Sequence, residues 1–201
     1  MSDDFILEIK ELIPKNECDK VIEKFESCGR KQEGRIGELG RVDYKIKKST
    51  DAFFIFKKDD DLGISVINEY LPIGIKKYTE RHPFITTIAS WDIDYYYKIQ
   101  RYYPNEGFFE LHCENTSCKS KRMLAWMIYL NDVTDDGYTE FPSQGKKYQP
   151  RAGTMLIWPA FYTHPHKGVA SKTQTKYIAT GWCDYSDHVT KSKIVPKMNY
   201  E

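Results

Sequence analysis

The stretch "WDIDYYYKIQRYY", residues 91–103, begins the part of the chain that decides the fold. Three more short apolar or alternating segments follow it, "RMLAWMIYLND" (122–132), "TMLIWPAF" (154–161) and "KYIATGWCDY" (176–185). The turn-forming sequences "PNEG", "DDG", "SQG" and "RAG" lie between the segments. Several short strands at this spacing, after helical segments, predict a mainly β fold with flanking helices: a double-stranded β-helix, or jelly roll.

The part of the chain before residue 91 has a different pattern of apolar and polar residues. "FILEIKELIP" (5–14) alternates apolar and polar residues and ends at a proline, which predicts a short strand. "KNECDKVIEKFESCG" (15–29) has apolar residues at helical spacing, with Asn16 as the expected N-cap and Gly29 at the expected C-terminal cap. These features predict a strand followed by a helix.

A second helical pattern covers residues 60–80 and contains Pro72. Because proline lacks a backbone N–H and clashes with the preceding turn, we expect one or two helical pieces that divide near it. No internal repeat or low-complexity linker separates the segments, so the chain is predicted to be one domain. The expected parts of that domain (1–201) are an N-terminal strand and helices (about 1–90), a jelly-roll core (about 91–185) and a C-terminal tail (about 186–201).

Composition excludes several classes of protein. With 201 residues and 40% hydrophobic content, the chain can bury one sizeable core. The net charge of +1 argues against nucleic acid or an acidic membrane as a partner. Five cysteines without a CxxC pair, and no apolar N-terminal or membrane-spanning segment, predict a reduced, cytoplasmic protein. The oligomeric state cannot be read from the sequence.

Two residues in "RYYPNEGFFELHCEN" (101–115) suggest chemistry. His112 and Glu114 are two positions apart, so in a strand both side chains would point to one face. Such a pair alone is often structural. A third ligand could come from His164 or His166, which follow an apolar strand. Two histidines and a carboxylate suit a non-haem Fe(II) oxygenase, although zinc accepts the same ligands.

Lys176 begins a strand that is otherwise rich in apolar and aromatic residues. A lysine inside such a strand is costly to bury unless an anion meets it. The alternative is an exposed lysine at the strand edge, which is common. A dicarboxylate that chelates a metal through one end would need a cation for its far carboxylate, and Lys176 lies ten positions after His166.

These motifs, in this order, resemble the Fe(II)- and 2-oxoglutarate-dependent dioxygenases of the prolyl 4-hydroxylase type. The resemblance covers roughly residues 5–185 and rests on "RYYPNEGFFELHCEN", "RMLAWMIYLNDVTDDGYTEFP", "KYQPRAGTMLIWPAFYTHPHKG" and "KYIATGWCDY". It implies Fe(II), 2-oxoglutarate and O2 as cofactors, with ascorbate as a further candidate. It also implies roles for individual residues: His112, Glu114 and His166 as metal ligands and catalytic residues, with Lys176 and Tyr102 as contacts of 2-oxoglutarate.

Three of these assignments involve a choice between neighbouring residues or a departure from the family pattern. His166 is preferred to His164 because a basic residue and a glycine follow it directly, as in the family pattern. Tyr103 is adjacent to Tyr102 and could take its role. Glu114 stands where most of the family has Asp; it is longer by one methylene but keeps the charge and the donor oxygen.

The resemblance implies hydroxylation of a C–H bond, with a peptidyl proline as the leading substrate and succinate as a product. The same chemistry on another peptide residue or a small metabolite remains open, as do a non-catalytic metal-binding jelly roll and a zinc hydrolase. Arg122 is expected either at the active-site mouth or in a strand-edge salt bridge, and residues 30–50 could form a lid. An aromatic entrance is expected from Tyr95, Tyr96, Tyr97, Phe108, Phe109 and Tyr138.

Overall fold

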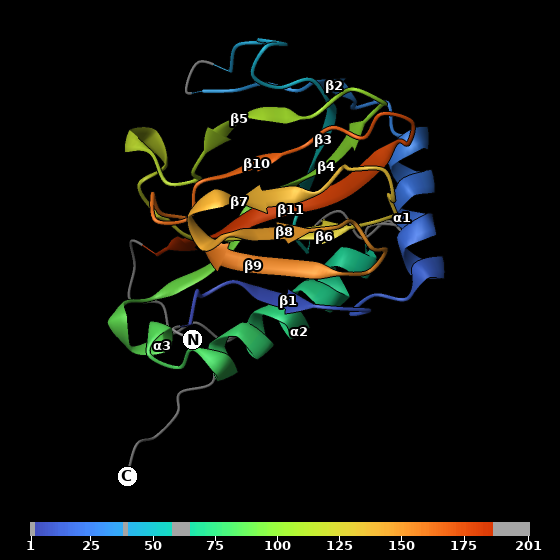
Figure 1. The fold of residues 1–201 in the computed structure, drawn as a ribbon. Coiled ribbons are helices and arrows are strands. Elements are labelled where there is room, and N and C mark those ends of the chain that lie inside the picture. The colour runs from blue at the N-terminus through green and yellow to red at the C-terminus, as the bar shows by residue number, and fades with distance from the viewer. Residues whose placement is uncertain (1–2, 38–39, 58–64, 187–201) are drawn as a thin grey trace.

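The computed structural model describes residues 3–37, 40–57 and 65–186. Two antiparallel β-sheets face each other, and helices cover the outer side of the larger sheet (Figure 1). This arrangement confirms the predicted mainly β jelly roll with flanking helices. In the described part of the chain, no helix has both the length and the apolar character that a membrane crossing requires.

The larger sheet has the strand order β1-β9-β6-β11-β4-β3-β2. Its strands are β1 (Leu7–Ile9), β2 (Gln32–Glu33), β3 (Thr50–Ile55), β4 (Trp91–Tyr102), β6 (Arg122–Tyr129), β9 (Met155–Pro159) and β11 (Lys176–Tyr185). The smaller sheet has the order β5-β10-β7-β8. Its strands are β5 (Phe108–His112), β7 (Thr139–Phe141), β8 (Lys146–Tyr148) and β10 (His166–Gly168). Short 3₁₀ turns occupy Ser117–Lys119 and Pro142–Gln144.

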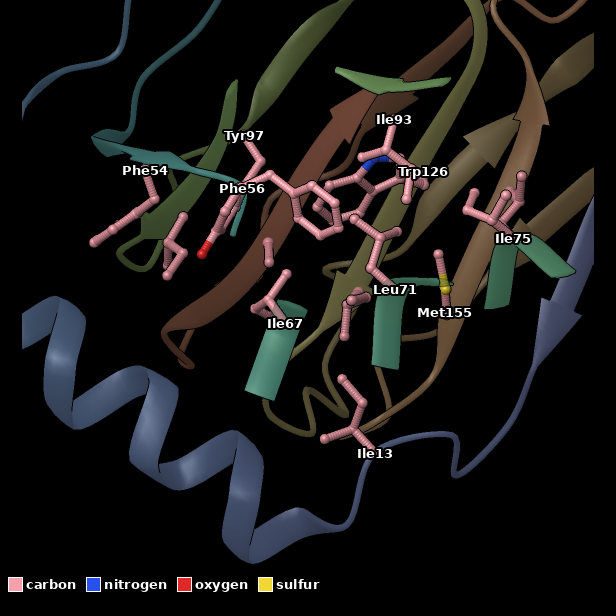
Figure 2. Close-up of a cluster of buried hydrophobic side chains, with 14 of the residues drawn as sticks. Ile13, Phe54, Phe56, Ile67, Leu71, Ile75, Ile93, Tyr97, Trp126 and Met155 are labelled. Carbon is pink, nitrogen blue, oxygen red and sulfur yellow. The ribbon is translucent and has the colours of Figure 1, made fainter. Parts of the chain in front are cut away.

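Helices α1 (Lys15–Ser27), α2 (Ser65–Arg81) and α3 (Ile85–Ile88) complete the described fold. Ile67, Leu71 and Ile75 follow one another at four-residue spacing, so they form one stripe along α2. Figure 2 shows this stripe against Trp126 and Tyr97 of the larger sheet. Burial of this apolar interface from water is the main force that holds the helical layer to the sheet.

Strand β4 alternates between the two faces of the larger sheet. Tyr97 and Ile99 point into the core beneath the helices. Lys98, Gln100 and Tyr102 point instead into the space between the two sheets. Because side chains alternate along a strand, a single sequence therefore supplies both an apolar core and a polar inner wall.

The structure changes several element boundaries. The N-cap of α1 is Pro14 rather than Asn16, and its C-cap is Cys28 rather than Gly29. Helix α2 continues through Pro72 instead of dividing there, because its apolar face is buried along its length. The β1 strand is shorter than the predicted segment, and α3 was not predicted. The expected tail beyond residue 186, and the start of the second helical pattern before residue 65, lie outside the described residues.

Candidate metal centre

Pairing of β5 with β10 brings two histidines together. His112 and His166 are directly opposite each other in this antiparallel pair, with ring centroids 4.4 Å apart. Glu114 comes two residues after β5 ends, so the expectation that it shares a strand face with His112 is wrong. Its backbone N–H instead donates to the carbonyl of Ala160, 3.0 Å away, beyond the end of β9. This turn directs the carboxylate to the same point as the histidines.

The three side chains are arranged as metal ligands would be. Nε2 of His112 is 3.6 Å from Oε1 of Glu114, and Nε2 of His166 is 3.5 Å from the same oxygen. One ligand atom from each residue lies within 4.8 Å of the others. The Nδ1 atoms are 3.0 Å from the backbone carbonyls of Glu110 and His164, which favours protonation at Nδ1. Both Nε2 lone pairs are then available to a cation.

The second oxygen of Glu114 is held by the protein. Oε2 accepts hydrogen bonds from Nε1 of Trp182, at 2.8 Å, and from Nη1 of Arg122, at 3.2 Å. The guanidinium of Arg122 lies 3.4 Å from the centroid of the Trp182 ring. Burial raises the pKa of the Glu114 carboxyl, but hydrogen bonds and charge from His112 and His166, when these are protonated, hold it well below its usual value. One oxygen is thus fixed, and the other faces the imidazoles.

Aromatic rings hold the imidazoles in place. Phe108 stacks on His112, with centroids 3.6 Å apart and an interplanar angle of 11°. Phe141 and Trp158 lie against His166, with centroids 5.2 and 5.0 Å away. These contacts restrict ring rotation, which is the preorganisation a metal site requires.

Lys176 is buried at the inner wall of the cavity, with 4% of its surface exposed. Its ammonium donates to the carbonyl of Gly137, at 2.8 Å, and no carboxylate among the described residues pairs with it. Desolvation therefore lowers the pKa of Lys176 to about 8. The structure excludes the alternative of an exposed strand-edge lysine and leaves a buried cation that suits an anion.

The two candidate tyrosines differ in position. Tyr102 pairs with Lys176 across β4 and β11, and its ring centroid is 5.0 Å from the lysine ammonium. Its hydroxyl donates to Gln100 at 3.2 Å, and its side chain is buried. Tyr103 is 46% exposed on the other side of the sheet. Of the pair, Tyr102 is the one that could contact a molecule bound to Lys176.

A cavity of about 650 Å³ connects these groups. It is lined by the His112–Glu114–His166 triad, by Lys176 and by Tyr102. Residues 35–37 and 40, from the segment expected as a lid, also line it. Its volume is typical of a pocket for a small molecule or a side chain.

Other expected residues lie elsewhere. Nε2 of His164 is 2.8 Å from the carbonyl of Asp4, so this histidine packs against the N-terminal segment rather than the triad. Tyr97 is not at the entrance, because it is buried between Phe54 and Trp126 in the core beneath the helices. Of the other aromatic residues expected at the entrance, the cavity lining includes Tyr96 and Phe108.

Two contacts within the site were not anticipated. The sequence indicated only that Trp182 is an apolar strand residue, yet its indole N–H donates a hydrogen bond to the carboxylate of Glu114. Lys98 was not singled out, yet it points into the cavity. The signal was present in the two-residue periodicity: Trp182 shares a strand face with Lys176, and Lys98 shares one with Tyr102.

Comparison with known proteins agrees with this geometry. The model of the 2OG-Fe(II) oxygenase superfamily matches residues 97–184, which contain the triad and Lys176. A mimivirus protein named "Putative prolyl 4-hydroxylase" (Acanthamoeba polyphaga mimivirus) is 30% identical over 103 residues, or 42% of this chain and 43% of that protein. The match thus spans less than half the length of this curated relative.

Solved structures show the same fold. The viral collagen prolyl hydroxylase of Paramecium bursaria Chlorella virus-1, in its 2OG complex, superposes with a TM-score of 0.63 and 17% identity, covering 90% of this chain and 97% of that one. A Trichoplax adhaerens prolyl hydroxylase, solved with a hypoxia inducible factor peptide fragment, gives a TM-score of 0.70 and 15% identity, covering 90% and 84%.

Residues 97–184, which contain the triad, match the 2OG-Fe(II) oxygenase superfamily, and the fold is shared with solved prolyl hydroxylases. These matches confirm the resemblance to prolyl 4-hydroxylase-type dioxygenases noted in the sequence motifs. The cofactors that the superfamily implies are Fe(II), 2-oxoglutarate and O2. The donor set fits such a metal, because two neutral imidazoles and one carboxylate leave coordination positions for a cosubstrate.

Proposed function

We propose that the protein is a non-haem Fe(II)- and 2-oxoglutarate-dependent dioxygenase that hydroxylates a C–H bond, with a peptidyl proline as the leading substrate. One observation supports this above all others. Two imidazole nitrogens and a carboxylate oxygen converge beside a cavity whose inner wall presents a buried ammonium with no carboxylate partner among the described residues. The assignment to proline follows the name of the mimivirus relative.

Bound Fe(II), with 2-oxoglutarate and O2, supplies the chemistry: one oxygen atom enters a C–H bond of the substrate, and the other enters succinate as CO2 leaves. In this proposal His112, Glu114 and His166 hold the metal on one side, which leaves the remaining positions open. Trp182 and Arg122 fix Oε2 of Glu114, so the longer Glu side chain presents Oε1 alone. The extra methylene is therefore compatible with a metal site.

Lys176 orients the cosubstrate without taking part in bond-making. Its ammonium offers a charge-assisted hydrogen bond to the far carboxylate of 2-oxoglutarate, and Tyr102 lines the same part of the cavity. Lys176 is only 4% exposed, and a charged contact away from bulk water is stronger than one at the surface. We also propose that residues 1–201 form one catalytic domain, with the jelly roll at about 91–185 as its core.

Turnover tests the proposal directly. Purified protein is incubated with Fe(II), 2-oxoglutarate and proline-rich peptides. The succinate formed is measured, and the masses of the peptides are determined by mass spectrometry. We expect succinate only when O2 is present, and a gain of one oxygen atom on proline. The His112→Ala variant, which lacks one metal ligand, is the matched control and should form neither succinate nor hydroxylated peptide. Activity of a zinc-loaded protein without O2 or 2-oxoglutarate would contradict the proposal and support a hydrolase.

A further inference from the structure

The cavity is far more basic than the chain as a whole. Over the whole chain, 30 lysine and arginine residues face 29 aspartate and glutamate residues. The described residues that line the cavity include six basic side chains and two acidic ones. The basic ones are Arg35, Lys47, Lys98, Lys119, Arg122 and Lys176, and the acidic ones are Asp94 and Glu114. Fe(II) and the 2-oxoglutarate dianion add no net charge, so this excess persists in the loaded site.

Two of the basic residues are matched by carboxylates. Lys47 lies 2.7 Å from Oδ2 of Asp51, which also accepts a hydrogen bond from the side chain of Gln100. Arg122 lies 3.2 Å from Oε2 of Glu114. In the proposed function Lys176 is reserved for 2-oxoglutarate. Three basic lining residues remain: Arg35 and Lys119 are exposed, whereas Lys98 is half-buried and so is the inward-facing cation to which no role has been assigned.

The ammonium of Lys98 lies 5.4 Å from the ring centroid of Phe53 and 5.3 Å from that of Trp182. Among the described residues it makes no hydrogen bond or close ion pair, and the carboxylates of Asp51 and Glu114 attract it only from a longer distance. Desolvation, followed by repulsion from Lys47, lowers the pKa of Lys98 to about 8. A desolvated cation held between aromatic rings has little to reorganise when an anion arrives.

Lys98 cannot serve the same carboxylate as Lys176. Lys98 pairs with Thr180 across β4 and β11, whereas Lys176 pairs with Tyr102. The two lysines are therefore four residue pairs apart on one face of the sheet, or about 13 Å along the strands. Lys98 is beside Trp182, which bonds to the carboxylate of the triad. A five-carbon dicarboxylate bound at the triad and at Lys176 does not reach it.

We propose that Lys98 binds an anionic group of the substrate, so that the enzyme hydroxylates a molecule with a carboxylate close to the oxidised carbon. This inference deepens the proposed function and rests on it. Arg35 and Lys119 also line the cavity, so their positive charge favours entry of an anion. The carboxylate has two possible sources: an acidic residue next to the target proline in a peptide, or the carboxyl group of a small molecule.

Binding measurements separate the two sources. Protein is loaded anaerobically with Mn(II) and 2-oxoglutarate, so that no turnover occurs, and ligands are titrated by calorimetry. The peptide pair is N-acetyl-Glu-Pro-Gly-amide and its Gln twin, which differ only in charge. The small-molecule pair is N-acetylproline and N-acetylproline amide. We expect the acid of at least one pair to bind roughly 10- to 100-fold more tightly than its neutral twin, as for one charge-assisted hydrogen bond.

Two variants assign the preference to the lysine. Lys98→Gln removes the ammonium and should abolish the difference between acid and neutral twin. Lys76→Gln makes the same change of net charge on α2, on the other side of the larger sheet, and should retain the difference. Affinity for 2-oxoglutarate should be unchanged in both variants. This unchanged affinity also shows that the site remains folded.

Each outcome decides the matter. A preference for the acid in either pair, lost only in Lys98→Gln, supports the inference and identifies the source. Equal or undetectable binding of the acid and neutral ligands to wild-type protein overturns it, as does a preference that survives in Lys98→Gln. Failure of wild-type protein to bind Mn(II) and 2-oxoglutarate rejects the proposed function, and the inference with it. Successful loading without an acid preference rejects the anion site alone.

Discussion

His166 lies directly opposite His112 in the antiparallel β5–β10 pair, and both Nδ1 atoms are 3.0 Å from backbone carbonyls. The register of two short strands therefore sets the distance between the imidazoles, and the backbone sets which nitrogen faces the centre. Glu114 completes the set from the turn that follows β5. The site is thus assembled by strand pairing between segments more than fifty residues apart in the sequence.

Removal of His166 should abolish metal binding, and removal of His164 should not. His166→Ala deletes a nitrogen of the triad, so we expect a loss of Fe(II) affinity greater than the roughly 10- to 100-fold typical of outer-shell changes. His164→Ala loses a hydrogen bond to Asp4, which should cost about 1 kcal/mol of stability but preserve the metal site. Calorimetric titration and thermal melts measure the two effects. Equal metal affinity in the two variants would contradict the assignment.

Trp182 should contribute to metal affinity although it is not a ligand. Trp182→Phe keeps an aromatic side chain but removes the indole N–H that donates to Oε2 of Glu114 at 2.8 Å. We expect Fe(II) affinity to fall roughly 10-fold, in the range seen for residues that orient ligands. Trp126→Phe is the matched control, because its Nε1 has no partner among the described residues and its ring packs in the core beneath the helices rather than against the triad. A loss of the same size in both variants would point to packing rather than to the hydrogen bond.

Binding of 2-oxoglutarate should weaken at alkaline pH. The pKa of Lys176 is lowered to about 8 by burial, so the free protein loses this charge as the pH rises through that value. Since the carboxylate needs the protonated form, the dissociation constant should rise about tenfold per pH unit above 8, until the pKa of the complex is reached. Lys98→Gln should keep this dependence, and Lys176→Gln should lose it and bind roughly 10- to 100-fold more weakly. A flat profile in wild-type protein would refute the role of Lys176.

Gly181 should be required for the core rather than for the site. A Cβ atom at this position would lie 2.6 Å from the Trp126 ring, which is fixed in the core. Gly181→Ala should therefore destabilise the protein by about 1–3 kcal/mol, as overpacking does. Gly29→Ala is the control, because nothing lies within 4 Å of its Cβ position, and its effect should be near zero. Urea denaturation measures both, and similar unfolding free energies would contradict the packing shown here.

The fold was predictable because apolar periodicity and turn residues repeat along residues 91–185. The ends of α1 were less predictable, since Asn16 satisfies the N-cap preference but Pro14 occupies the cap. The predicted division of the helix near Pro72 was wrong for a similar reason. Proline disfavours a helix locally, but burial of the apolar stripe on α2 stabilises a continuous helix. Propensity therefore predicted the elements, and packing decided where they end.

The site shows a related division. The residue types of His112, Glu114 and His166 were evident from the motifs, but the reason for their convergence was not. Glu114 reaches the centre from a turn, and the strand argument for it was wrong although the residue was right. Contacts across the sheet, such as Trp182 with Glu114, require the register and cannot be read from spacing.

The visible absorption of the anaerobic complex tests the central claim most directly. Fe(II) chelated by 2-oxoglutarate in a site of two histidines and one carboxylate gives a weak metal-to-ligand charge-transfer band. We predict that wild-type protein develops this band when both are added, that Lys176→Gln needs more 2-oxoglutarate to do so, and that the band decays on admission of O2 as succinate forms. A folded wild-type protein that develops no band at saturating Fe(II) and 2-oxoglutarate would contradict the account.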